Sequence, residues 1–171
     1  MNRKSFLQQA AIGSSFLAVP SFLLSQTAPP TKQPKGDPLP PEKVKDFVGA
    51  GHNNLDKVKQ LLLEFPTLLY ATWDWGGGDF ETGLEGAGHV GTKEIANYLI
   101  EKGARTNLFV LTMLGKTQIV KAYIETYPAY LYARGPHGYT LLHHAQRGGE
   151  DAKELFDYLQ SKGLKETRTK L

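Results

Sequence analysis

Histidine and carboxylate side chains are the groups in this sequence that could do chemistry, because imidazoles and carboxylates transfer protons and bind metal ions. The sequence contains no cysteine, so a thiolate could not take part. Four acidic residues, Asp74, Asp79, Glu81 and Glu85, precede His89 at short intervals. A cluster of Asp79, Glu81, Glu85 and His89 would suit a metal-dependent or acid/base enzyme, and this is one of two hypotheses for the function.

The spacing of the histidines, however, matches no short metal-binding pattern. The five histidines are His52, His89, His137, His143 and His144. The last two are adjacent, so they would lie about 100° apart on a helix and could not easily share an ion. Acidic residues in a hairpin are more often solvated turn residues than catalysts. The sequence therefore favours a protein that is not an enzyme and has neither a metal site nor a cofactor.

The stretch 73–80, WDWGGGDF, holds both tryptophans of the chain and three consecutive glycines. Glycine adopts positive φ at little cost, so this segment predicts a loop that presents Trp75, Asp74 and Asp79 to a partner. The alternative is that the aromatic residues at its two ends pack beneath the loop while the aspartates cap turns. No Lys-Ser/Thr pair follows the glycines, which argues against a phosphate-binding loop.

Residues 138–145, GYTLLHHA, resemble the Gly-x-Thr-Pro-Leu-His-x-Ala signature that opens an ankyrin repeat. Residues 91–104, GTKEIANYLIEKGA, are similar to the outer helix of the same repeat. The resemblance covers residues 41–163. It implies an all-α repeat solenoid of about four ankyrin-type helix-turn-helix repeats with short hairpin loops and a continuous core.

The resemblance also assigns structural roles. It implies that Thr82, Thr106 and Thr140 cap the first helices of their repeats, and that His143 bonds to the capping threonine and to neighbouring backbone. His144 would then occupy an exposed position of its helix.

One connection between repeats is predicted to be very short. Gly103 is expected to close one helix as a C-cap, and the next helix would begin about three residues later. The hairpin expected at this place would then be missing, and Leu108 would be buried. The neighbouring hairpins would flank a notch with Phe109 at its floor.

The first 26 residues predict an export signal, since a positive start (Asn2-Arg3-Lys4) precedes an interrupted apolar run. The segment RKSFLQ resembles the twin-arginine motif that directs folded bacterial proteins across the inner membrane. The general secretory route is the alternative. The expected location is the periplasm or the exterior, with an uncleaved N-terminal anchor as a further alternative. Residues 27–40 predict a proline-rich linker and residues 164–171 a polar tail.

The formal net charge of +3 gives no electrostatic case for nucleic acid, because part of it falls in the export signal. The favoured hypothesis is an exported protein-protein interaction module, expected to be a monomer whose domain does not insert into a membrane. It would bind another protein through its hairpin tips and the concave face of its inner helices. The predicted contact residues are Trp75, Asp74, Asp79, Phe109, His137, Tyr139 and His144.

Overall fold

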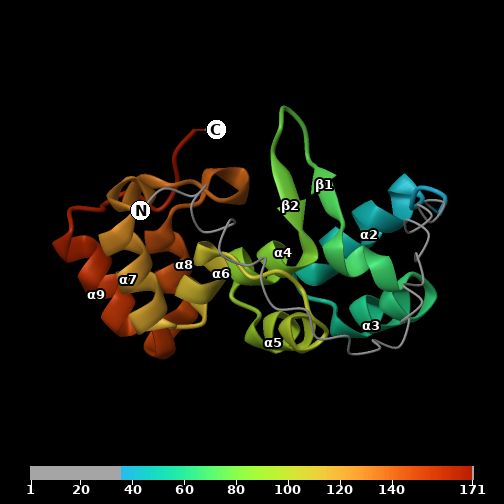
Figure 1. Cartoon of the computed structure of the whole chain (residues 1–171), viewed down its shortest axis with the longest axis horizontal. Coiled ribbons are helices and arrows are strands. Elements are labelled where there is room, and N and C mark those ends of the chain that lie inside the picture. The colour runs from blue at the N-terminus through green and yellow to red at the C-terminus, as the bar shows by residue number, and fades with distance from the viewer. Residues whose placement is uncertain (1–35, 171) are drawn as a thin grey trace, which may run out of the picture. The chain divides into compact units, whose positions relative to one another are not determined.

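A computed structural model describes residues 36–170 (Figure 1). The predicted export signal and the linker up to residue 35 lie outside the described residues. Within the described part of the chain, no helix is long and apolar enough to cross a membrane. The first described helix, α2, begins at Pro41, where the sequence places the start of the folded domain.

The helices form two rows. One row consists of α2 (Pro41–Gly51), α4 (Gly83–Val90), α6 (Leu108–Met113) and α8 (Leu141–Gly148), each in contact with the next. The other helices, α3 (Leu55–Glu64), α5 (Lys93–Glu101), α7 (Thr117–Thr126) and α9 (Lys153–Ser161), each pack against the first-row helix that precedes them. Short 3-10 segments connect them, namely η1 (Pro66–Tyr70), η2 (Pro128–Tyr132), η3 (Pro136–Gly138) and η4 (Gly149–Ala152).

Two of the three predicted caps need correction. Thr82 caps α4 as predicted, in a reciprocal capping box with Glu85. The N-cap of α6 is Asn107 and not Thr106, because the Asn107 side chain accepts the hydrogen bond from the backbone N–H of Val110. Thr140 stands at the N-cap of α8 but makes no cap bond. Its hydroxyl donates instead to the carbonyl of Glu166, at 2.7 Å.

The predicted glycine loop is the turn of a β-hairpin. Strands β1 (Thr72–Asp74) and β2 (Phe80–Thr82) pair antiparallel, with Trp73 opposite Glu81. The three glycines between the strands all have positive φ, and Asp74 Oδ1 accepts the N–H groups of the first and third. The hairpin projects beyond the helices that carry it (Figure 1).

The prediction of an all-α repeat solenoid with short hairpin loops is wrong. The described residues are largely helical, but they also contain the β1–β2 sheet. The buried apolar residues form two clusters instead of one continuous core, one centred on Phe47, Val58 and Ile95, the other on Val120, Leu141 and Leu155. The connections are too unequal for one recurring unit, since they include a β-hairpin, 3-10 segments and a very short link from α5 to α6. In that link the C-cap of α5 is Lys102, one residue before the predicted Gly103, which follows it with positive φ, and Leu108 is buried as predicted.

Candidate metal centre

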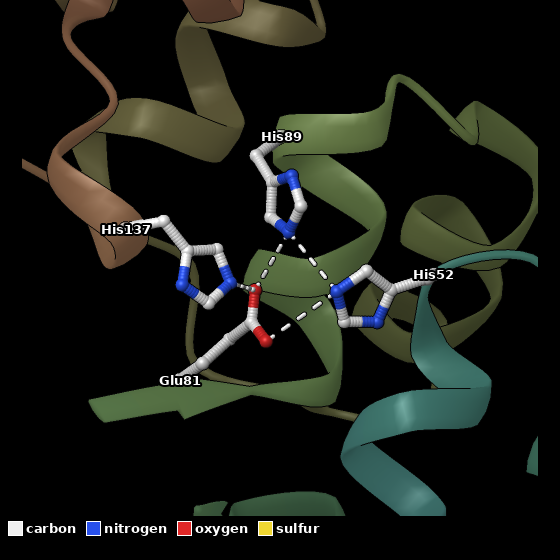
Figure 2. A group of neighbouring side chains, drawn as sticks. All are labelled: His52, Glu81, His89 and His137. Carbon is white, nitrogen blue, oxygen red and sulfur yellow. Dashed lines mark hydrogen bonds and ion pairs between the residues drawn. The ribbon is translucent and has the colours of Figure 1, made fainter. Parts of the chain in front are cut away.

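Four side chains from different elements point toward one another and form the candidate metal centre (Figure 2). They are His52 directly after α2, Glu81 in β2, His89 in α4 and His137 in η3. Each offers one nitrogen or oxygen atom, and these four atoms all lie within 4.8 Å of one another. Glu81 is fully buried, His89 is nearly so, and the side chains of His52 and His137 are about one-fifth exposed.

Close packing of α2 against α4 positions His52. A Cβ atom on Gly51 would lie 2.3 Å from the carbonyl oxygen of Gly83, so the two helices could not approach this closely with a larger residue. A Cβ atom on Gly86 would lie 2.9 Å from the His52 ring. Glycine at both positions therefore lets the His52 ring lie against α4, beside His89.

The hairpin and the start of α4 position Glu81 and His89. The register of β2 turns Glu81 inward, where the indole N–H of Trp75 donates to its Oε2 at 2.7 Å. His89 Nε2 lies 2.9 Å from Oε1 of Glu81 and 3.0 Å from Nε2 of His52. The Tyr139 ring stacks on the His89 ring, with 5.2 Å between centroids.

Asp79 holds His137 in an unusual conformation. His137 has φ 59°, which is left-handed and uncommon for a residue with a side chain. The Asp79 carboxylate accepts both the backbone N–H of His137, at 2.8 Å, and its ring Nδ1–H, at 2.6 Å. These two bonds turn Nε2 of His137 toward Glu81 Oε1, at 3.5 Å.

Hydrogen bonds outside the centre determine which ring nitrogens carry lone pairs inside it. His52 Nδ1 lies 3.1 Å from the carbonyl oxygens of both Val48 and Gly49, so it must carry the proton. His137 Nδ1 carries a proton because it donates to Asp79. In the neutral rings, Nε2 of His52 and Nε2 of His137 therefore both present lone pairs to the centre.

Glu81 contributes a buried carboxylate at the same place. Among the described residues, its buried Oε1 has no hydrogen-bond partner, because the 2.9 Å approach of His89 Nε2 lacks hydrogen-bond geometry. A single proton on His89 could not satisfy the carboxylate and two imidazole lone pairs together. A metal ion could, since it accepts one electron pair from each donor.

The donor separations fit a metal ion. With bonds of about 2.1 Å, donor atoms lie roughly 3.0 Å apart at right angles and roughly 3.4 Å apart at the tetrahedral angle. His89 Nε2 lies 2.9 Å from Glu81 Oε1 and 3.0 Å from His52 Nε2, while His137 Nε2 lies 3.5 Å from Glu81 Oε1 and His52 Nε2 lies 3.5 Å from the other oxygen, Oε2. All four donors lie within 4.8 Å of one another, so the longest separations exceed those of a bound ion. Side-chain movements that shorten the longest separations by about 1 Å would bring all four donors to bonding distance.

Four titratable groups near the centre have shifted pKa values. Burial raises the pKa of Asp79, but the hydrogen bonds from the backbone and ring of His137 outweigh burial and hold this pKa below its usual value. Asp79 therefore remains an ionised acceptor for the His137 ring. Burial, together with the nearby Glu81 carboxylate, raises the pKa of Glu85 despite hydrogen bonds from Thr82 and Asn107. Burial lowers the pKa of His143 and, to about 3, that of His144.

The sequence hypothesis of an Asp79/Glu81/Glu85/His89 cluster identifies half of this centre. Glu81 and His89 belong to it, while Asp79 lies outside it and binds the His137 ring. Glu85 points elsewhere and is held by the α4 cap and by Asn107, whose side-chain amide donates to Oε1 at 2.7 Å. His52 is not part of that hypothesis, and the sequence predicts His137 as a partner contact instead.

The predicted contact residues are not all exposed. Trp75 is 39% exposed and bonds Glu81, Asp74 organises the hairpin turn, and Tyr139 is partly buried between His89 and His143. The prediction that His144 is exposed is wrong: the side chain is buried, its Nδ1–H donates to the Thr140 carbonyl, and its ring packs on Phe109.

The predicted role of His143 also needs correction. Its Nε2–H donates to the carbonyl of His89, at 2.8 Å, and not to a capping threonine. The bond is still structural, but it links α8 to α4 beside the metal centre.

Comparisons with known proteins find no family model, no curated protein and no solved structure that matches this chain. The function is therefore inferred from the geometry of the centre.

Proposed function

We propose that this protein binds one divalent transition-metal ion through His52, Glu81, His89 and His137. The observation that carries the proposal is the convergence of two oriented imidazole lone pairs with a buried carboxylate oxygen that has no hydrogen-bond partner among the described residues. Buried charges in proteins are paired or coordinate metals, and Oε1 of this carboxylate has no proton donor among the described residues. A bound cation would give the buried Oε1 of Glu81 a positively charged partner.

The donor set favours a metal of intermediate softness. Three imidazole nitrogens and one carboxylate oxygen suit Zn²⁺, Cu²⁺, Ni²⁺ or Fe²⁺, whereas Mg²⁺ and Ca²⁺ prefer oxygen ligands. The hydrogen bonds made by the ring nitrogens that face away from the centre are those expected of metal-binding histidines. Two of the histidines donate their other ring N–H to carbonyls or a carboxylate, which fixes the tautomer and the ring orientation.

The ion would fasten separate parts of the chain together. Its four donors come from the end of α2, the β-hairpin, α4 and η3. Four protein donors fill a tetrahedral coordination shell, which is the arrangement of a structural zinc site. We therefore assign the ion a structural role, stabilising the hairpin and η3 against the helices.

Metal binding is tested with Zn²⁺ by calorimetry and with Co²⁺ by visible absorption, on protein first stripped with a chelator. Wild type should bind one equivalent. Glu81→Gln, which keeps the shape but removes the charge, should weaken binding more than about 100-fold, since loss of an outer-shell partner alone costs 10–100-fold.

Asp74→Asn is the matched control, because Asp74 is an acidic residue of the same hairpin outside the centre, and it should bind like wild type. Wild type that binds no metal, or Glu81→Gln that binds as tightly as wild type, would refute the proposal.

Recognition of another protein through the hairpin is a second proposal, favoured by exposed aromatic side chains at that place. Phe80 is 59% exposed and Trp75 is 39% exposed, and both belong to the projecting hairpin (Figure 1). Phe80→Ser should abolish binding to a protein isolated with the wild type while leaving Zn²⁺ affinity unchanged, since Phe80 lies outside the centre. Retained partner binding by Phe80→Ser would exclude the hairpin as the contact surface.

A further inference from the structure

The C-terminal residues 166–170 lie along the loop that carries His137. The backbone N–H of Thr169 donates to the Gly138 carbonyl at 2.9 Å, and the N–H of Thr140 donates to the Thr167 carbonyl at 3.1 Å. Tyr139 and Arg168 form an antiparallel bridge between these two bonds. The segment that the sequence predicts as a polar tail is therefore paired with folded backbone.

Side chains strengthen this pairing from both directions. The Nε–H of Arg168 donates to the backbone carbonyl of His137 at 2.8 Å, and the guanidinium lies over the Tyr139 ring, 5.1 Å from its centroid. From the other side, Arg134 donates to the carbonyl of Lys170. Tyr139 in turn stacks on the His89 ring. Arg168 therefore contacts the backbone of one proposed metal donor, His137, and the ring that packs on another, His89.

The loop needs such support because two consecutive residues are left-handed. His137 has φ 59° and Gly138 has φ 75°. A Cβ atom on Gly138 would lie 2.0 Å from the Thr169 carbonyl oxygen, so the C-terminal segment fits closely against this backbone. A non-glycine residue in this conformation persists only when its surroundings fix it. For His137 those surroundings are Asp79 on one side and Arg168 on the other.

From these contacts we infer that residues 166–170 form a latch whose docking is coupled to metal binding, with Arg168 as a positioning residue for His137. The inference rests on the proposed metal site. The latch is defined as residues 166–170. Because the docked latch holds His137 in its binding conformation, docking favours metal binding. Linkage requires the converse, so a bound ion must favour the docked latch by the same factor. Metal binding would thereby increase the fraction of molecules in which residues 166–170 are docked.

Trypsin tests the coupling, because it cleaves after Lys165 and Arg168, at the edge of the latch and within it. Cleavage of chelator-treated and Zn²⁺-saturated wild type is followed by mass spectrometry of the intact protein. Zn²⁺ should slow the release of the latch by about 5-fold or more, the lower end of typical coupling between sites. Glu81→Gln controls for effects of Zn²⁺ on trypsin and should be cleaved equally fast in both conditions.

The reverse direction is tested with Arg168→Ala and its matched control Lys165→Ala, a nearby cation outside the latch. Arg168→Ala should weaken Zn²⁺ binding about 10-fold, as expected for loss of an outer-shell contact, while Lys165→Ala should bind like wild type. The Co²⁺ spectrum at saturation should be unchanged in Arg168→Ala, because all four donors are still present. His137→Gln should alter that spectrum, since it removes a donor.

The outcomes separate the two proposals. If wild type binds no metal, the proposed function fails and the latch fails with it. If wild type binds metal but latch cleavage is the same with and without Zn²⁺, the coupling alone is refuted. Equal Zn²⁺ affinity of Arg168→Ala and Lys165→Ala would likewise refute the positioning role of Arg168. Should Arg168→Ala lose its fold, the trypsin experiment on wild type still decides.

Discussion

Replacing Glu81 with glutamine should have opposite effects on stability with and without metal. In the metal-free protein, the fully buried Glu81 carboxylate keeps one oxygen on Trp75 and leaves the other without a hydrogen-bond partner among the described residues. The Nε2 lone pairs of His52 and His137 face the same place. Glutamine would remove the buried charge, keep an acceptor for Trp75, and present an N–H donor to those lone pairs.

The size of each effect follows from these contacts. A buried polar group without a partner costs about 1–3 kcal/mol, so Glu81→Gln should raise the metal-free unfolding free energy by an amount in that range. For wild type, free Zn²⁺ at 100 times the dissociation constant should add about 2.7 kcal/mol, and this contribution should vanish in the variant. The stability order of the two proteins should therefore reverse when Zn²⁺ is added, provided that the metal-free gain of the variant is below about 2.7 kcal/mol.

Urea unfolding at pH 8, in EDTA and in excess Zn²⁺, measures both quantities. Asp74→Asn serves as the control and should follow wild type in both conditions. If Glu81→Gln is less stable than wild type in EDTA, the carboxylate is compensated by a protonated histidine, and the centre is a buried ion pair. That result would refute the reasoning from unpaired donors.

Three further changes test the surroundings of the centre. Asp79→Asn should weaken Zn²⁺ binding about 10–100-fold in calorimetry, because the His137 ring loses its charged acceptor, and an unchanged affinity would contradict that role. Gly51→Ala should lower the unfolding free energy by about 3 kcal/mol, because its Cβ would meet the Gly83 carbonyl, whereas Gly49→Ala in the same helix has open space and should be neutral or stabilising. His144 should make the unfolding free energy depend on pH, because its pKa is about 3 in the folded state, below the usual 6.5. Its stabilisation of the folded state is complete above pH 6.5 and is lost as the pH falls toward 3. The loss should reach about 2 kcal/mol by pH 5, and urea unfolding at pH 7 and 5 should show a smaller difference for His144→Gln than for wild type.

Features that depend on a few neighbouring residues could be predicted from the sequence. The cap of α4 by Thr82, the end of α5 beside Gly103 and the glycine turn of the hairpin each depend on a few consecutive residues. The predicted repeat solenoid was wrong, because helix pairs with similar sequences can be joined by different connections. The β-hairpin and the divided core depend on how distant segments pack. The Thr106 cap failed for a local reason, since Asn107 was available one residue later.

The candidate metal centre was only half visible from the sequence because its proposed donors are far apart along the chain. Glu81 and His89 fall within one short stretch, so the sequence could group them. His52 reaches them through the close approach of Gly51 to Gly83, and His137 through the left-handed η3 segment held by Asp79. Neither contact leaves a regular spacing. The best available sign was the recurrence of glycines, at positions 51, 83 and 86, in segments that also carry histidine and glutamate.

The contrast between His144 and the metal-centre histidines shows what decides the role of a buried imidazole. Both His144 and His52 donate Nδ1–H to backbone carbonyls of the helix turn before them. The ring of His144 then packs on Phe109, where burial holds its pKa near 3 and it serves as a neutral core residue. The ring of His52 instead directs its second nitrogen at His89 and a buried carboxylate. The residue type and its first hydrogen bond are the same, so the function depends on what the second nitrogen faces.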